Sequence, residues 1–271
     1  MRTRHSGVRL FYCGALAVLT FGFALLCTFG IASADGPWLP ENISTLGERI
    51  DHLYRVIFVL VAVLFFLTEA ALIWFIIRFR RRDGVKASNV SHSHLAEAIW
   101  TIIPGLILVF LAIYQWNAWA DAKIRAPDEA TSLRVQIIAK QFEWRMRYPG
   151  PDGVFATDDD VTLTNQLYIP EGKNVIAQLR AEDVIHSFFL PHLRVKQDVA
   201  PGPGNTMLLW FDANKTGTYE IACAELCGLG HYRMRAQLFV QSADEFESWL
   251  QQKYDEGKKP ADWGWDWKEG V

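Results

Sequence analysis

The chain has 271 residues, with 27 Lys and Arg against 30 Asp and Glu, which gives a formal net charge of -3. This balance excludes the strongly basic surface typical of nucleic-acid binding, and the length suits one ordinary domain with membrane anchors or two small domains. The cysteines fall into two distant groups, Cys13 with Cys27 and Cys223 with Cys227, which does not favour a disulfide framework.

The first apolar run covers residues 10–32, follows a basic start and ends in the small-residue sequence Ala-Ser-Ala. A basic start, an apolar middle and a small-x-small end are typical of a secretory signal peptide. We therefore predict a signal peptide over residues 1–34, followed by an exported segment over residues 35–54. Because the run is longer than a typical signal core, an uncleaved third membrane helix is the alternative.

Two further apolar runs, residues 56–77 and 99–116, are each long enough to cross ~30 Å of hydrocarbon. The segment between them begins with a cluster of basic residues, which marks the cytoplasmic side of a membrane; they are Arg78, Arg80, Arg81, Arg82 and Lys86. The sequence thus predicts a transmembrane hairpin over residues 55–120, with a cytoplasmic loop over residues 78–96. Everything after about residue 120 would face outward, across a bacterial-type inner membrane.

From residue 133 the pattern changes to short alternating segments separated by Pro- and Gly-rich turns, which is typical of a β-sandwich or barrel. The predicted strands are residues 133–138, 141–148, 161–169, 174–180, 207–211, 218–222 and 236–240. We assign this domain to residues 121–241. An amphipathic helix over residues 244–253 and a tryptophan-rich tail complete the C-terminal region, residues 242–271.

One twelve-residue stretch, from Cys223 to Met234, contains two thiols, an imidazole and a thioether. This soft ligand set favours copper or zinc over magnesium or calcium. A structural zinc site has no reason to prefer Met234, and a mononuclear blue-copper site uses only one cysteine. Two thiolates can instead bridge two copper ions, with His231, Met234 and a backbone carbonyl among the remaining ligands.

A dinuclear site needs one more histidine from outside this stretch. His186 follows Asp183-Val-Ile and precedes a bulky apolar sequence, which would hold a ligand in a dry and rigid shell, whereas His192 has basic neighbours. We favour His186. The plainer interpretation, a core or surface histidine beside an ordinary thiol pair, does not explain why histidine and methionine accompany the cysteines.

The pattern Cys-x-Glu-x-Cys-Gly-x-x-His-x-x-Met resembles the subunit II family of haem–copper oxidases, and residues 97–104, 183–187 and 196–202 match that family in the same order. The resemblance implies a two-helix transmembrane hairpin plus an all-β cupredoxin-like Greek-key barrel. It implies a cytochrome-c oxidase subunit that accepts electrons one at a time from cytochrome c and passes them to the haem of subunit I. There, oxygen is reduced to water and protons are translocated. The partners would be subunit I, other oxidase subunits, cytochrome c and membrane lipid.

The resemblance also implies individual roles. The side-chain ligands of a dinuclear copper A centre would be His186, Cys223, Cys227, His231 and Met234. Glu225 would bind copper through its backbone carbonyl and direct its carboxylate to a magnesium ion at the subunit I interface. Glu97 would lie at the cytoplasmic entrance of a proton path; the plainer alternative is a carboxylate favoured by the helix N-terminus. Asp183 and Asp198 would belong to the acidic surface or the subunit interface.

The chain departs from the family pattern at Phe142, where relatives often have a tryptophan. Trp144 matches the second aromatic position and would be the point where electrons enter. Arg145 and Arg147 would weaken an acidic landing face, so we expect a donor that is held close by. The alternative function is a membrane-anchored copper-binding or copper-delivery protein outside an oxidase, for which a complete ligand set is less suitable.

Overall fold

The computed structural model describes residues 39–86 and 92–256, which form two compact units. The helical unit covers residues 51–117, and the β unit covers residues 40–50 together with the chain from residue 118. The signal peptide predicted over residues 1–34, the cysteines within it and the tryptophan-rich tail lie outside the described residues.

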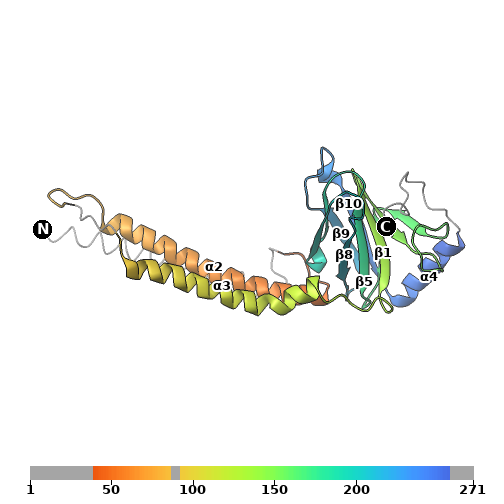
Figure 1. Cartoon of the computed structure of the whole chain (residues 1–271), viewed down its shortest axis with the longest axis horizontal. Coiled ribbons are helices and arrows are strands. Elements are labelled where there is room, and N and C mark those ends of the chain that lie inside the picture. Colours follow the sequence, from red (N-terminus) through yellow and green to blue (C-terminus); the bar gives the residue numbers. More distant parts are fainter. Residues whose placement is uncertain (1–38, 87–91, 257–271) are drawn as a thin grey trace. The chain divides into compact units, whose positions relative to one another are not determined.

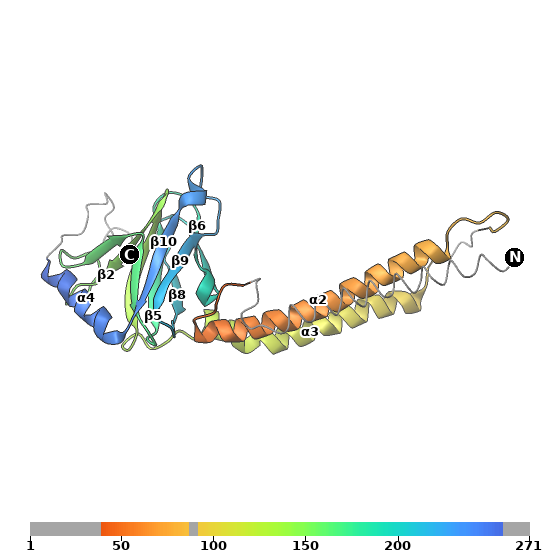
Figure 2. The same cartoon turned by 180° about the vertical axis from the view of Figure 1, so that it is seen from behind.

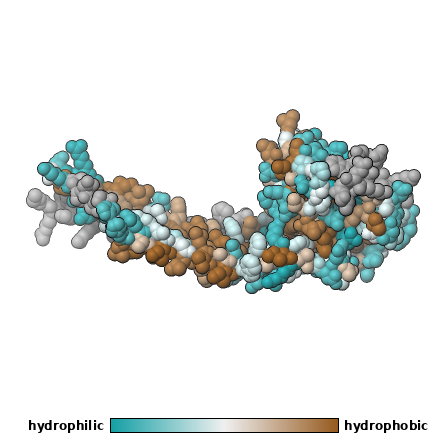
Figure 3. All heavy atoms as spheres, viewed as in Figure 1, coloured by the Kyte–Doolittle hydropathy of each residue, from teal (hydrophilic) through white to brown (hydrophobic). Residues whose placement is uncertain are grey.

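The helical unit is built from α2 (Thr45–Arg78) and α3 (His94–Lys123), which run antiparallel side by side (Figures 1 and 2). Both are long and apolar enough to cross a membrane. They extend beyond the apolar runs because hydropathy marks the lipid-facing part of a helix and not its ends. A hydrogen bond of 2.8 Å between His52 Nε2 and Tyr114 Oη joins them. Figure 3 shows apolar residues gathered along the helices and polar residues over much of the β unit.

The β unit contains two five-stranded sheets. One has the order β3-β2-β1-β5-β8 and the other the order β4-β10-β9-β6-β7. Their bounds are β1 Leu133–Lys140, β2 Glu143–Tyr148, β3 Val161–Thr164, β4 Gln166–Pro170, β5 Val175–Ala181, β6 His186–Leu190, β7 Val195–Val199, β8 Met207–Phe211, β9 Gly217–Cys223 and β10 Arg235–Gln241. The pairs β1–β5 and β10–β4 are parallel, and the other pairs are antiparallel.

Side chains from both sheets form one core. Ile137, Trp144 and Leu179 come from the first sheet, Phe188 and Leu238 from the second, and all five are fully buried. Two sheets that bury a common face make a sandwich. The predicted fold class, a two-helix hairpin followed by an all-β cupredoxin-like domain, is confirmed.

The strand predicted over residues 161–169 is two strands that belong to different sheets: β3 pairs with β2, and β4 pairs with β10. The chain changes sheet at Asn165, which has a φ of 57° and whose side-chain oxygen accepts a 2.8 Å hydrogen bond from Trp144 N. Asparagine tolerates this left-handed conformation better than most residues. Alternation of apolar residues continues across the turn, so periodicity alone did not reveal it.

Two strands were not predicted. In β6 four of five residues are buried, so it shows no alternation, while β7 carries charged residues on its exposed face. The segment before α2 also differs from a simple exported linker. Ile43 is fully buried in the β core, its N–H donates to His192 O at 3.0 Å, and its carbonyl accepts from Asn214 N at 2.8 Å. The start of α2 is therefore built into the β unit.

The helix α4 (Ala243–Asp255) follows β10 directly and covers the predicted residues 244–253. Ser242 caps it: its side chain accepts from Glu245 N, and the Glu245 carboxylate accepts from Ser242 N. Phe246 and Trp249 of this helix pack against Tyr148, which extends the aromatic core.

Candidate metal centre

The metal motif lies in the connection between β9 and β10, two neighbouring antiparallel strands. Cys223 is the last residue of β9, and the short helix η2 (His231–Arg233) ends just before Met234 and β10. The base of this loop is closed by a hydrogen bond of 3.2 Å from Cys223 N to Met234 O. The strand register, which pairs Ala222 with Arg235, holds the two ends of the loop at a fixed separation.

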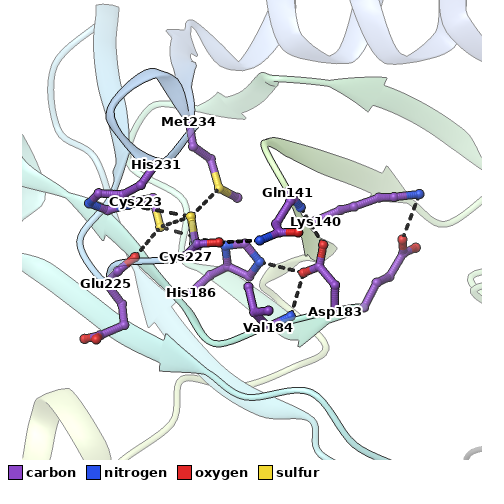
Figure 4. A network of polar contacts seen from close by, with 11 residues as sticks. Lys140, Gln141, Asp183, Val184, His186, Cys223, Glu225, Cys227, His231 and Met234 are labelled. Carbon is purple, nitrogen blue, oxygen red and sulfur yellow. Dashed lines mark hydrogen bonds and ion pairs between the residues drawn. The ribbon is translucent and has the colours of Figure 1, made fainter. Parts of the chain in front are cut away.

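The five side chains predicted as ligands converge at this loop (Figure 4). Cys223 Sγ lies 3.9 Å from Cys227 Sγ and 3.9 Å from His186 Nδ1. Cys227 Sγ lies 3.6 Å from His231 Nδ1 and 3.7 Å from Met234 Sδ. The sulfur–sulfur separation is far beyond a disulfide bond of ~2.05 Å. This soft donor set fits copper, and each cysteine has a histidine of its own.

The alternative histidine, His192, is not part of this cluster. Its Nδ1 lies 2.9 Å from Glu41 O, and its ring packs against Tyr219 at 5.0 Å between centroids. The carbonyl oxygen of Glu225, which was predicted to be a backbone ligand, lies 3.2 Å from Cys223 Sγ. Its exposed side chain points away from the sulfur atoms (Figure 4).

His186 is fully buried, and a carboxylate holds its imidazole. Asp183 Oδ1 lies 2.8 Å from Nε2, which leaves Nδ1 facing Cys223. Asp183 also accepts hydrogen bonds of 2.7 Å from Gln141 N and Val184 N. Burial opposes ionisation of Asp183, but these bonds and the one from His186 lower the pKa of its carboxyl group. A carboxylate behind a ligand histidine fixes the ring orientation and is typical of metal sites.

Sequence reasoning missed this role and assigned Asp183 to an acidic surface or interface. The available signal was the Asp-x-x-His spacing, which brings the two side chains together at the start of β6. Asp198 is exposed and accepts a 2.7 Å hydrogen bond from Ser187 Oγ. Gln141 was also missed: its Nε2 donates to Cys227 O and ties the metal loop to the β1–β2 turn.

The two thiols differ in acidity. Burial disfavours the thiolate of Cys223, but hydrogen bonds from His186 and from backbone groups outweigh it and lower the pKa of Cys223 to about 6. Burial and the neighbouring negative charge of Cys223 raise the pKa of Cys227 to about 12. The first thiolate therefore forms easily, whereas the second requires a cation to compensate its charge.

Trp144 is fully buried beside the site, with its ring centroid 6.0 Å from His186 and 5.2 Å from Phe188. Phe142 is partly exposed and lies against the metal loop. A Cβ added to Gly230 would stand 2.4 Å from Phe142 Cδ2, so only glycine fits beneath this ring. Of the two aromatic positions, Phe142 is therefore the outer one and Trp144 the inner one.

Arg145 and Arg147, which we expected to weaken an acidic landing face, both lie beside carboxylates of the β unit. Arg145 Nε lies 2.7 Å from Glu143 Oε1, and its Nη1 lies 3.5 Å from Glu182 Oε1. Arg147 is buried and faces Asp160, with Nε 3.5 Å from Oδ2. Both arginines are largely buried, and their charges are therefore balanced by neighbouring carboxylates.

Glu97 belongs to the helical unit and lies in the first turn of α3. Its side chain is about half exposed, and its Oε2 lies 3.5 Å from His94 Nδ1. Its N–H donates to Ser93 O at 3.0 Å. This position fits both a carboxylate at a helix N-terminus and a proton-collecting group.

Taken together, the fold and the site define a membrane-anchored, cupredoxin-like metalloprotein with a sulfur-rich centre. Residues 153–242 match the family model for the periplasmic domain of cytochrome c oxidase subunit II, and residues 32–117 match the model for its transmembrane domain. Cytochrome c oxidase subunit 2 of Thermostichus vulcanus is 31% identical over 86% of this chain and 84% of that protein. An alternative cytochrome c oxidase subunit 2 of Bradyrhizobium diazoefficiens is 29% identical over 80% of this chain and 84% of that protein.

A solved periplasmic domain of subunit II from Bradyrhizobium japonicum is 28% identical, with a TM-score of 0.43 over 49% of this chain and 100% of that one. The sequence matches show that the chain belongs to the cytochrome c oxidase subunit II family. It is accordingly a membrane protein with a periplasmic, copper-binding domain and a component of an oxidoreductase complex that works with subunit I. A copper-delivery protein outside an oxidase is not favoured.

Proposed function

We propose that this chain is the electron-accepting subunit of a respiratory cytochrome c oxidase in a bacterial inner membrane. It takes electrons one at a time from cytochrome c and passes them to the haem of subunit I, which reduces oxygen to water while protons are translocated. The observation that carries the proposal is the convergence of two thiols 3.9 Å apart, each with its own imidazole neighbour. This doubled set of donors would suit two copper ions better than it suits one ion.

The residues that would hold the dinuclear copper A centre are His186, Cys223, Cys227, His231 and Met234, together with the carbonyl of Glu225. When bound, the copper pair accepts and releases single electrons. The chain keeps the donors still, because the base of the loop is bonded across β9 and β10 and His186 is fixed by Asp183. Donors that stay in place in both redox states add little reorganisation cost to each transfer.

Two carboxylates would serve the assembled enzyme on opposite sides of the membrane. The exposed side chain of Glu225 is directed away from the sulfur atoms and would bind a magnesium ion at the interface with subunit I. Glu97, half exposed at the start of α3, would collect protons on the cytoplasmic side for a path in subunit I. The proposal includes the domain limits predicted from the sequence, among them a signal peptide over residues 1–34 and a copper domain over residues 121–241.

Electrons would approach through the Phe142 side of the domain. Trp144 would then be an internal contact between that surface and His186, because its buried ring cannot itself meet a donor. Cytochrome c, soluble, tethered or within a larger complex, is the donor class that membership of the family implies.

The decisive experiment is a metal count and spectrum of the full-length chain purified in detergent and reconstituted with copper. Two copper ions per chain, intense visible absorption and an electron paramagnetic resonance pattern from one electron shared by two copper nuclei are expected. The bound copper should also resist removal by a chelator. A copper-delivery protein, in contrast, must release its metal readily. One zinc ion in a colourless chain, or one copper ion that the chelator removes at once, would refute the proposal.

A further inference from the structure

An open pocket of about 440 Å³ lies in the β unit, far along the chain from the metal motif. Its walls include Arg49 from the first turns of α2, Asp121 from the last turn of α3, and Arg125 just after that helix. Asn174 and Asp212 complete the polar part of the lining. None of these residues takes part in the function proposed above.

The pocket has a definite level in the bilayer. Arg49 lies seven residues before the apolar run of α2, and Asp121 lies five residues after the apolar run of α3. At a rise of ~1.5 Å per residue, both lie roughly 8–10 Å outside the hydrocarbon layer, at the height of lipid phosphates. Lipid headgroups occupy this level of a bilayer.

The basic side of the pocket offers hydrogen-bond donors. Arg49 Nη1 and Arg125 Nη1 both bind the carboxylate of Asp121, the latter at 2.9 Å, and both arginine side chains are more than half exposed. A guanidinium has five N–H donors in a planar fork, and each of these arginines contacts Asp121 through Nη1. Among the described residues, Nε and Nη2 of each arginine have no partner and can donate to a ligand. Trp210 Nε1 donates to Asp121 O at 2.7 Å and fixes the wall behind this carboxylate.

The acidic side offers an acceptor. Asp212 Oδ2 accepts hydrogen bonds from Thr45 N and Thr45 Oγ1 at the start of α2. Oδ1 of the same carboxylate has no partner among the described residues. With two arginines and two aspartates, the pocket has no net charge. Asp121 is paired with both arginines, whereas Asp212 accepts from Thr45.

We propose that this pocket binds the headgroup of a phospholipid that carries both a phosphate and a primary ammonium group, as in phosphatidylethanolamine. The phosphate binds the free donors of Arg49 and Arg125, and the ammonium donates to Asp212. A quaternary ammonium has no N–H to donate, and an anionic lipid without an ammonium leaves Asp212 unmatched.

The test uses the full-length chain in detergent, titrated with lipids and followed by native mass spectrometry. Phosphatidylethanolamine is expected to remain bound at least about tenfold more tightly than phosphatidylcholine or phosphatidylglycerol, because it alone completes both charge-assisted contacts. The double variant Arg49→Gln, Arg125→Gln is expected to lose that preference. The matched control is Arg134→Gln, which removes a partly exposed ion pair with Glu129 outside the pocket lining and should bind as the unmodified chain does.

A second variant is needed because the Arg49–Asp121 pair joins two segments of the chain, so that its loss can disturb folding. Asn174→Phe fills the pocket without removing an ion pair and is expected to lower retention of phosphatidylethanolamine similarly. The copper spectrum reports whether each variant is folded. Equal retention of all three lipids, unchanged retention in Asn174→Phe, or saturable binding of inorganic phosphate with no lipid preference would each overturn the proposal.

Discussion

The indole of Trp144 and the imidazole of His186 lie edge to face, with an interplanar angle of 62° and 6.0 Å between their centroids. Trp144 is fully buried, and its Nε1 has no hydrogen-bond partner among the described residues. The ring of Trp144 therefore packs directly against His186, one of the proposed copper ligands.

This relationship leads to the first prediction. In Trp144→Phe, a smaller ring keeps most of the packing but loses the indole contact with His186, so electron transfer from the native cytochrome donor should slow several-fold. Stopped-flow reduction of the copper-loaded chain measures this rate. Trp249→Phe, at the α4 side of the domain, is the matched control and should transfer normally. An unchanged rate in Trp144→Phe would remove this residue from the electron path.

Asp183→Asn should loosen the imidazole of His186 while leaving the fold intact. Loss of such a carboxylate behind a ligand histidine typically lowers metal affinity by about 10–100-fold. Competition with a copper chelator measures the affinity. Glu220→Gln removes an exposed carboxylate of the sheet that contains His186. Its ion-pair partner among the described residues is Arg235, and this variant should have no effect. Equal affinities in the two variants would mean that Asp183 does not position His186.

Among the ligands, the cysteines should matter most. Cys223→Ser or Cys227→Ser should abolish the two-copper site, because a shared thiolate serves both ions and its loss removes two bonds. Met234→Leu should retain copper and shift the redox potential, since a thioether is a weak ligand that would mainly tune the potential. Metal analysis and voltammetry distinguish these outcomes. A Cys223→Ser chain with an intact two-copper spectrum would contradict the assignment of ligands.

In the copper-free chain, alkylation by iodoacetamide should reach Cys223 before Cys227. Cys223 is the more exposed thiol, and its lowered pKa of about 6 makes thiolate available from slightly acidic pH upward, whereas Cys227 stays protonated. The rate at Cys223 should rise between pH 5 and 7 and then level off. Peptide mapping by mass spectrometry follows both positions. Earlier labelling of Cys227 would reverse the assigned acidity of the pair.

Glu97→Ala should slow turnover of the assembled oxidase and leave the copper spectrum unchanged, because the carboxylate and the metal loop belong to separate units. The slowing should grow as proton concentration falls, since fewer protons are then available to a weakened collecting site. Oxygen consumption across a range of pH measures it. Glu48→Ala, at the other end of the hairpin, is the control. Turnover that matches this control at every pH would favour the helix-terminus role.

The sequence was most informative where chemistry is local. Five of the six donors, counting the carbonyl of Glu225, lie within twelve residues, so their convergence followed from spacing. His186 could be chosen because its neighbours are bulky and apolar. The supporting contacts of Asp183 and Gln141 depend on how the β1–β2 turn approaches the start of β6, and no local pattern encodes that approach.

The same distinction applies to the fold. Alternating segments identified most strands, and apolar length identified both membrane helices. The change of sheet at Asn165 and the largely buried strand β6 were missed, because an alternating pattern identifies only strands with one face in solvent. The internal pairing of Arg145 and Arg147 was missed for a related reason: charge in a sequence does not reveal which carboxylates the fold places beside it.

Because the metal loop is closed between two adjacent strands, the loop can be transferred to another protein as one unit. Transplanting residues 223–234 between two neighbouring antiparallel strands of another β-sandwich would carry along every donor except His186. The recipient would need only a histidine on the strand beside the donor hairpin, with a carboxylate three residues earlier to orient it. Redesign of the site in a soluble scaffold thus reduces to one loop and two point substitutions.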